Sequence, residues 1–240
     1  MHEWPRELML IRHGESAGNV ARAAALRDDL ADIDIAGRDC DVALSALGEQ
    51  QSVALGTWLA AQWEAPDAVL SSPFERAVRT AALMREAAGW DGVPVRTDER
   101  LREKEFGMLD RLTRRGIEQR FPEQAAMRAA LGKFYYRPPG GESWTDVLLR
   151  LHSFADTLRR DYAGKRVAVV SHQVVVLCLR YLIEGLDERR ILAIDALGDG
   201  ANCSITQYAG TELLRYNDTA PLDARATPVT AEPDVPVAPK

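Results

Sequence analysis

The sequence of 240 residues lacks the features that mark several special classes of protein. No run of roughly eighteen apolar residues occurs, so no membrane-spanning helix is expected. The formal net charge of −6 argues against a nucleic-acid-binding protein, because such proteins usually carry an excess of positive charge. The first residues also lack the apolar stretch of a signal peptide. We therefore expect a globular protein of the cytoplasm that binds neither membranes nor nucleic acids.

Cysteine is scarce as well. Cys40, Cys178 and Cys203 are widely spaced and include no Cys-x-x-Cys pair. An odd number of scattered cysteines argues against a disulfide framework and a typical zinc site, so we expect reduced thiols without a functional role. The acidic residues between positions 28 and 34 do not have the spacing of a calcium loop. We therefore expect no metal and no cofactor.

The sequence does contain a regular alternation of short apolar runs and longer helical patterns. The apolar runs predict strands at residues 8–11, 68–70, 93–97 and 167–170, with a closing pair at 203–208 and 212–216. Helical spacing predicts helices that start near residue 19 and that span residues 45–63, 73–88, 143–162 and 174–183. This alternation predicts a three-layer α/β/α fold, in which helices cover both faces of a mostly parallel central sheet.

Unusual polar residues follow several of the predicted strands. Arg12 and His13 end the first apolar run, residues 71–76 follow the second, and Ser171 with His172 follows the run at 167–170. A buried strand does not end in a cation without a compensating partner, because an unpaired buried charge is costly. Ligands of parallel sheets bind beyond the carboxyl ends of the strands. These segments are therefore expected to meet in one pocket.

The same segments resemble the motifs of a known family. The matching stretches are Arg12-His13-Gly14-Glu15, residues 71–80 with Arg76 in the first turn of a helix, residues 101–107 with a Glu-x-x-aromatic-Gly pattern, and Ser171-His172. They follow the order typical of the histidine phosphatase (phosphoglycerate mutase-like) superfamily, and the chain is similar to that superfamily over residues 8–208.

The resemblance and the chemistry of phosphoryl transfer together assign roles to these residues. The reaction needs a nucleophile, positive groups around the phosphoryl oxygens and an acid for the leaving oxygen. The expected site comprises the nucleophile His13, the phosphate-binding residues Arg12, Arg76, His172, Ser16 and Asn19, and the proton donor Glu103. Glu105 is the less favoured donor. The predicted enzyme is a metal-independent phosphatase of the histidine acid type that works through a phosphohistidine.

Two positions distinguish hydrolysis from phosphate transfer within the family. Mutases typically carry tryptophan where this chain has Gly18, and usually glycine where it has Gln173. Residues 171–173 and 140–143 are instead similar to the bisphosphatase half of a bifunctional fructose-bisphosphate enzyme. These features favour a phosphatase. The alternatives are a phosphoglycerate-type mutase, a phosphoprotein phosphatase and a non-catalytic phosphate-binding scaffold.

Three expectations concern the outer parts of the molecule. Residues 1–217 are expected to form the domain, with a helical insertion over the active site at about 109–141 and a disordered tail at 218–240. Residues 100–137 hold ten basic and five acidic side chains. If they overhang the pocket they favour a small, polyanionic phosphorylated substrate; a solvated, charged cap is the equal alternative. The apolar C-terminal strand could pair across a homodimer.

Overall fold

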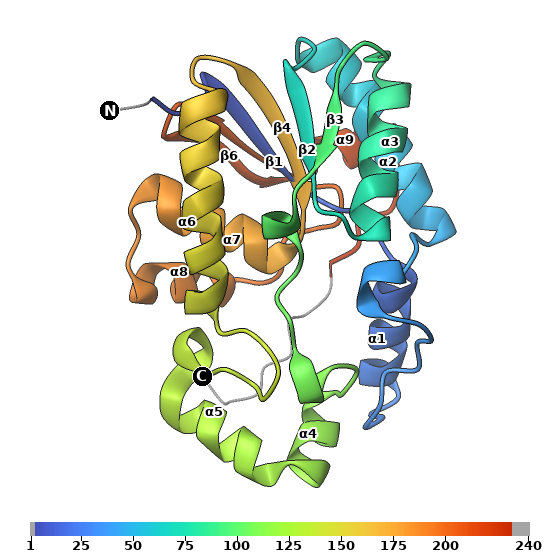
Figure 1. The fold of residues 1–240 in the computed structure, drawn as a ribbon. Helices are drawn as coiled ribbons and strands as arrows, with labels where there is room; N and C mark the ends of the chain where they lie inside the picture. The colour runs from blue at the N-terminus through green and yellow to red at the C-terminus, as the bar shows by residue number, and fades with distance from the viewer. Residues whose placement is uncertain (1–2, 232–240) are drawn as a thin grey trace.

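A six-stranded sheet in the order β3-β2-β4-β1-β5-β6 forms the centre of the fold (Figure 1). The computed structural model describes residues 3–231. Its strands are β1 (Glu7–Arg12), β2 (Ala68–Ser71), β3 (Val95–Thr97), β4 (Arg166–Ser171), β5 (Ile205–Ala209) and β6 (Glu212–Asp218). The pairs among β1, β2, β3 and β4 are parallel, whereas β5 is antiparallel to both β1 and β6. The expected mostly parallel sheet and its closing pair of strands are therefore confirmed.

Both faces of the sheet are buried, as the continuous apolar runs predict. In β1, Leu8 and Leu10 point into one hydrophobic cluster, while Met9 and Ile11 point into the other. None of these side chains is more than 1% exposed, and each contributes about 1.5–3 kcal/mol when it is buried. Helices α6 (Trp144–Asp161) and α7 (Gln173–Glu184) cover the first face, and α2 (Ala46–Gln62) and α3 (Glu75–Ala87) cover the second. The expected three-layer α/β/α fold is confirmed.

The insertion forms a small helical unit beyond one end of the sheet (Figure 1). The remaining α-helices are α1 (Ala17–Arg27), α4 (Arg114–Arg120), α5 (Pro122–Tyr135), α8 (Glu188–Asp195) and α9 (Ala220–Asp223), and short 3-10 helices span Asp39–Asp41, Glu99–Leu101 and Gly107–Leu109. Helices α4 and α5 enclose a minor core of their own around Ile117 and Tyr136. Arg115 and Arg120 of α4 pair with Asp29 and Asp32, so the acidic loop after α1 is bound to the insertion.

The expectation of a disordered tail is wrong for residues 218–231. This segment contains the end of β6 and helix α9, and Leu222 is completely buried in the core beside α2. Further along, Thr230 hydrogen-bonds to Gln51 and Asn202. One well-placed leucine and a few polar contacts anchor a segment whose average composition resembles that of a disordered chain. The part of the predicted tail from residue 232 onward lies outside the described residues.

The three cysteines of the chain are free thiols in this fold. Cys178 and Cys203 are buried and Cys40 is partly exposed, and none of them forms a disulfide. Burial raises the pKa of Cys203 to about 12, so its thiol stays protonated at neutral pH. No helix within residues 3–231 is both long and apolar enough to cross a membrane.

Candidate active site

The carboxyl ends of β1, β2 and β4 bring the predicted motifs together. Arg12 lies in register with Ser171, and the backbone N–H of His13 donates to the Ser171 carbonyl at 2.9 Å. On the other side of β4, the N–H of Ser72 donates to the Val170 carbonyl at 2.9 Å. The backbone hydrogen bonds of the sheet therefore continue for one residue beyond β1 and β2. They fix the positions at which His13 and Ser72 leave the sheet.

His13 is buried, and its ring orientation follows from one hydrogen bond. Nδ1 lies 2.7 Å from the carbonyl oxygen of Gly14, which can only accept, so Nδ1 carries the proton of the neutral ring and Nε2 keeps its lone pair. Gly14 itself packs tightly on α2: a Cβ there would lie 2.5 Å from the carbonyl oxygen of Gly48, so no larger residue fits. Burial, reinforced by the charges of Arg76 and Arg12, holds the His13 pKa well below its ordinary value. The ring is therefore neutral at neutral pH.

His172 lies beside His13, with ring centroids 5.0 Å apart in an edge-to-face arrangement. Its Nε2 is 2.8 Å from the hydroxyl oxygen of Ser72, and its Nδ1 has no hydrogen-bond partner among residues 3–231. A neutral ring that accepts the Ser72 hydroxyl proton at Nε2 carries its own proton on Nδ1. That N–H then has no acceptor among residues 3–231, and His172 itself is completely buried and does not line the cavity. The pKa of His172 is also lowered, chiefly by burial and next by the charge of Arg76.

Two buried guanidinium groups complete the inner end of the site. Arg12 and Arg76 are only 6% and 5% exposed, and Arg76 occupies the expected first turn of α3. Arg12 donates to the carbonyl of Gly200. Arg76 lies over the Phe74 ring and is held by Asp39, to whose carbonyl oxygen Nη1 donates at 2.6 Å and to whose Oδ2 Nη2 donates at 3.1 Å. Cations shielded from water in this way attract an anion strongly.

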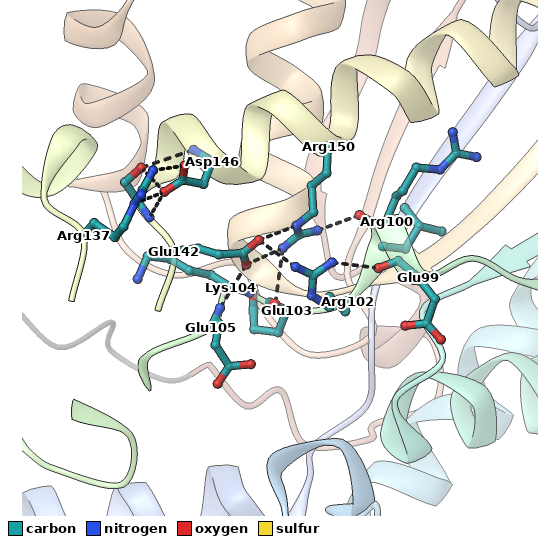
Figure 2. Close-up of polar contacts among 12 residues, drawn as sticks. Glu99, Arg100, Arg102, Glu103, Lys104, Glu105, Arg137, Glu142, Asp146 and Arg150 are labelled. Carbon is teal, nitrogen blue, oxygen red and sulfur yellow. Dashed lines mark hydrogen bonds and ion pairs between the residues drawn. The ribbon is translucent and has the colours of Figure 1, made fainter. Parts of the chain in front are cut away.

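Glu103 lines the same cavity, whereas Glu105 is exposed and does not. Desolvation raises the Glu103 pKa above its ordinary value, although the Lys104 N–H, which donates to Oε1 at 2.7 Å, and the charge of Arg76 partly oppose the rise. A carboxyl with a raised pKa keeps its proton at higher pH than an ordinary glutamate does, as a general acid requires. Figure 2 shows the arginine and glutamate network around this residue.

Ser16 and Asn19 both line the cavity, but each also holds the start of α1. The Asn19 N–H donates to Ser16 Oγ at 3.2 Å, and the Ser16 N–H donates to Asn19 Oδ1 at 2.7 Å, which is a capping box. The Ser16 hydroxyl proton and the Asn19 amide protons are not used in this box. Both residues can therefore still donate a hydrogen bond into the cavity.

Two polar residues that hold the loop after His13 in place were not predicted from the sequence. The buried Asn202 donates from Nδ2 to the carbonyl of His13 at 3.0 Å. Gln51 accepts from the N–H of Glu15 at 2.9 Å and donates to Thr230 Oγ1 at 2.9 Å. Nothing near these residues in the sequence signals the role, because each contact joins segments far apart in the chain.

The cavity has a volume of about 170 Å³, and its outer part differs from the inner end. Apolar side chains line the outer part of the cavity, namely Ile33, Ile35, Val42, Phe106, Leu109, Leu112 and Val174. The charged groups of the outer part are of both signs: Arg22, Arg111, Asp39, Asp110 and Asp199. Partial burial raises the Asp110 pKa, with the charge of Asp39 as a second cause.

Of the two equal alternatives for residues 100–137, this arrangement favours the charged cap over the basic overhang. Of the basic residues between positions 100 and 137, Arg111 lines the cavity and the others do not. Most of them pair with acids instead, as in Arg100–Asp98, Arg102–Glu142, Arg114–Glu118, Arg120–Asp32 and Arg137–Asp146. The segment is mainly a charged cap whose arginines pair largely with acids on neighbouring segments. Within residues 3–231, no cluster of His, Cys, Asp and Glu side chains could hold a metal ion.

Comparison with known proteins decides the family. Residues 8–219 match the histidine phosphatase superfamily (branch 1). The chain belongs to this superfamily. It is similar to the 6-phosphofructo-2-kinase/fructose-2,6-bisphosphatase 1 of Rattus norvegicus, with 31% identity over 180 residues, which are 75% of this chain and 33% of that protein. The chain therefore spans about a third of the length of this bifunctional relative.

Both phosphatases and mutases of the superfamily resemble the chain. The 2,3-bisphosphoglycerate-dependent phosphoglycerate mutase of Methylobacterium radiotolerans is 31% identical over 188 residues, or 78% of this chain and 82% of that one. Among solved structures, a mycobacterial glucosyl-3-phosphoglycerate phosphatase in complex with inorganic phosphate has a TM-score of 0.67 at 27% identity, over 90% of this chain and 99% of that chain. The family therefore leaves the choice between hydrolysis and transfer open.

Proposed function

We propose that the protein is a metal-independent phosphatase that hydrolyses small phosphate monoesters through a phosphohistidine on His13. One observation carries the proposal: an imidazole with a free Nε2 lines the same small cavity as Arg12, Arg76 and Glu103. Nucleophile, clamp and acid are the parts that phosphoryl transfer requires. A scaffold that only binds phosphate has no need of a carboxyl with a raised pKa.

The first half-reaction transfers the phosphoryl group to the enzyme. The Nε2 lone pair of His13 attacks phosphorus, the P–O bond of the ester breaks, and the leaving oxygen takes the proton of Glu103. Arg12 and Arg76 neutralise charge on the phosphoryl oxygens, and the Nδ1–H of His172 donates to one of them. Ser16 and Asn19 supply neutral hydrogen bonds to the same group.

The second half-reaction returns the enzyme to its starting state. The Glu103 carboxylate removes a proton from water, the water oxygen bonds to phosphorus, and the P–N bond to His13 breaks. Inorganic phosphate is released, and Glu103 is protonated again. The residue thus acts as acid in one step and as base in the next, without a metal ion.

The charges of the outer cavity favour hydrolysis over a mutase reaction. A bisphosphoglycerate-dependent mutase must keep a second phosphate bound next to the phosphohistidine site. Here, a second phosphate would meet the carboxylates of Asp39, Asp110 and Asp199 as well as Arg22 and Arg111. We infer that the preferred substrate has one phosphate group and a leaving group with apolar surface, because apolar side chains line the remaining wall.

A phosphatase screen tests this proposal directly. Phosphate release is measured over a panel of mono- and bisphosphorylated metabolites, with a chelator present and the His13→Ala variant as the blank. We expect chelator-resistant activity that prefers monophosphates, and no phosphoglycerate isomerisation in a parallel assay. Isomerisation faster than phosphate release would favour the mutase, and loss of activity with the chelator would indicate metal-assisted chemistry.

A further inference from the structure

We propose that Glu142 and Arg150 are positioning residues that hold the proton donor Glu103 in place for the cleavage step. The inference rests on the proposed role of Glu103. It gives a function to the Gly140-Gly141-Glu142-Ser143 turn, which the mechanism above does not use. Neither residue lines the cavity, so any influence on the reaction passes through the backbone of residues 99–105.

Arg150 binds the two ends of the segment that carries the acid (Figure 2). From α6, its Nη1 donates to the carbonyl of Arg100 at 2.6 Å and its Nη2 donates to the carbonyl of Glu103 at 3.2 Å. A guanidinium group offers several donors in a rigid plane, so these bonds fix both position and direction. The carbonyl of the acid itself is therefore held by a side chain that is only 10% exposed.

Glu142 orients Arg150 and binds the same segment from the other side. Its carboxylate accepts from Arg150 Nε at 2.9 Å and from Nη2 at 3.0 Å, which is a bidentate pair. It also accepts from Arg102 Nη2 at 2.9 Å and from the N–H of Glu105 at 3.1 Å. The residues immediately before and after the Lys104 peptide are thus anchored to one nearly buried ion pair.

Gly141 allows this close contact. A Cβ on Gly141 would lie 2.6 Å from the carbonyl oxygen of Glu105, and the N–H of Glu142 donates to that oxygen at 2.9 Å. Ser143 then caps α6, so the turn that carries Glu142 leads directly into the helix that carries Arg150. The turn and the segment that carries Glu103 are thus joined by the Glu142–Arg150 ion pair. Loss of this ion pair frees the backbone of Glu103 to shift.

A shift of the acid has a distinctive kinetic consequence. Poor leaving groups need a proton in the transition state, whereas a good leaving group such as p-nitrophenolate departs without one. A displacement of about 1 Å can cost on the order of 100-fold in rate. A variant that misplaces Glu103 should therefore lose activity selectively on esters with poor leaving groups. A merely structural defect lowers activity on all esters equally.

The test compares Glu142→Gln with a matched control. Glu184→Gln breaks a similar buried arginine–glutamate pair on α7, with Arg180, which does not contact residues 99–105. We measure kcat/KM for p-nitrophenyl phosphate, phenyl phosphate and glycerol 2-phosphate, with circular dichroism to check folding. For Glu142→Gln we expect a loss of roughly 10- to 100-fold on glycerol 2-phosphate and less than about 3-fold on p-nitrophenyl phosphate. Glu184→Gln should leave the ratio between the two substrates unchanged.

Arg150→Lys is the second variant if Glu142→Gln does not fold, because lysine keeps the charge but cannot bind two carbonyls and a carboxylate at once. The Glu103→Gln/Glu142→Gln double variant completes the cycle. We expect it to be no slower on glycerol 2-phosphate than Glu103→Gln alone. An equal loss on all substrates, or an additive loss in the double variant, overturns the proposal. Failure of Glu103→Gln to show leaving-group dependence would instead contradict the proposed function.

Discussion

The inner and outer parts of the cavity are built in different ways. The inner end is lined by Arg12, His13 and Arg76, which lie beyond the carboxyl ends of β1 and β2 and are almost fully buried; His172 is completely buried beside His13 and does not line the cavity. The outer wall consists of the loop at residues 33–42 and the segment at 106–112, with apolar side chains and the exposed acids Asp39 and Asp110. The ends of the strands thus hold the proposed nucleophile and cations in place, and the loops that follow Glu103 and α1 provide the surface for the rest of the substrate.

The two parts meet at the ion pair between Arg76 and Asp39. Arg76 is nearly buried, but the Asp39 side chain is 46% exposed. A phosphate that binds Arg76 must share its donors with Asp39 or displace it. The outer loop can therefore influence phosphate affinity without contributing to the reaction itself.

Substitution of the inner nucleophile is expected to have the largest effect. His13→Ala removes the atom that attacks phosphorus, so kcat should fall by about 10⁴-fold or more. Steady-state phosphate release measures this loss, and retained binding of inorganic phosphate, which needs no bond to the imidazole, would show that the clamp survives. Activity within 10-fold of the wild type would falsify the role of His13.

The acid is expected to have the next largest effect, together with a characteristic pH profile. His13 must be neutral to attack, and its pKa lies well below 6.5. On the acid side, kcat/KM should therefore fall only as the pH drops through this lowered pKa, where the ring becomes protonated. Glu103 must be protonated in the first step and its pKa is raised above 4.5, so kcat/KM should fall as the pH rises through that higher value.

Glu103→Gln should lose about 10²- to 10³-fold on alkyl phosphates and should abolish the alkaline limb. An alkaline limb that persists in this variant would assign it to another group.

A smaller effect is expected where the inner and outer parts meet. Asp39→Asn removes the carboxylate that holds the donors of Arg76, so inorganic phosphate should inhibit about 5-fold more strongly, equivalent to ~1 kcal/mol for a half-exposed pair. Asp41→Asn in the same 3-10 helix is the control, because Asp41 pairs with the exposed Arg38. Weaker inhibition in Asp39→Asn would mean that Asp39 supports phosphate binding by orienting Arg76.

The smallest effect is expected at the outer wall. Ile35→Ala removes apolar contact area, so KM for a bulky aryl phosphate should rise by roughly 2- to 3-fold while kcat for a small substrate stays the same. Val20→Ala changes an apolar side chain that is more exposed than Ile35 and does not line the cavity, and it serves as the control. A fall in kcat for every substrate would show that the outer wall takes part in the chemistry.

The same division explains what the sequence could predict. The meeting of Arg12, His13 and His172 was predictable because Arg12 ends β1, His13 and His172 directly follow β1 and β4, and parallel strands end at one edge. Asn202 and Arg150 were not predictable, because each binds a backbone carbonyl that only the folded chain brings near. An isolated asparagine or a helix arginine has no sequence pattern that names its partner.

The tail and the insertion show the same limit. Average composition predicts disorder after residue 217. One buried leucine at position 222 and the contacts of Thr230 nevertheless anchor residues 218–231 to the domain. The excess of basic residues between positions 100 and 137 left a positive overhang and a charged cap as equal alternatives, because acidic partners such as Asp32 and Asp146 lie on other segments. Net charge along the chain does not reveal which charges are neutralised by tertiary contacts.

The central claim is that the phosphoryl group passes through Nε2 of His13, and trapping the intermediate tests it most directly. The protein is mixed with p-nitrophenyl phosphate, quenched within milliseconds and digested, and the peptides are analysed by mass spectrometry under alkaline conditions that preserve phosphohistidine. We expect one phosphoryl group on the peptide that contains His13, labile to acid and absent from His13→Ala. Full turnover with no phosphorylated His13 peptide, or with the phosphoryl group on another residue, would contradict the account.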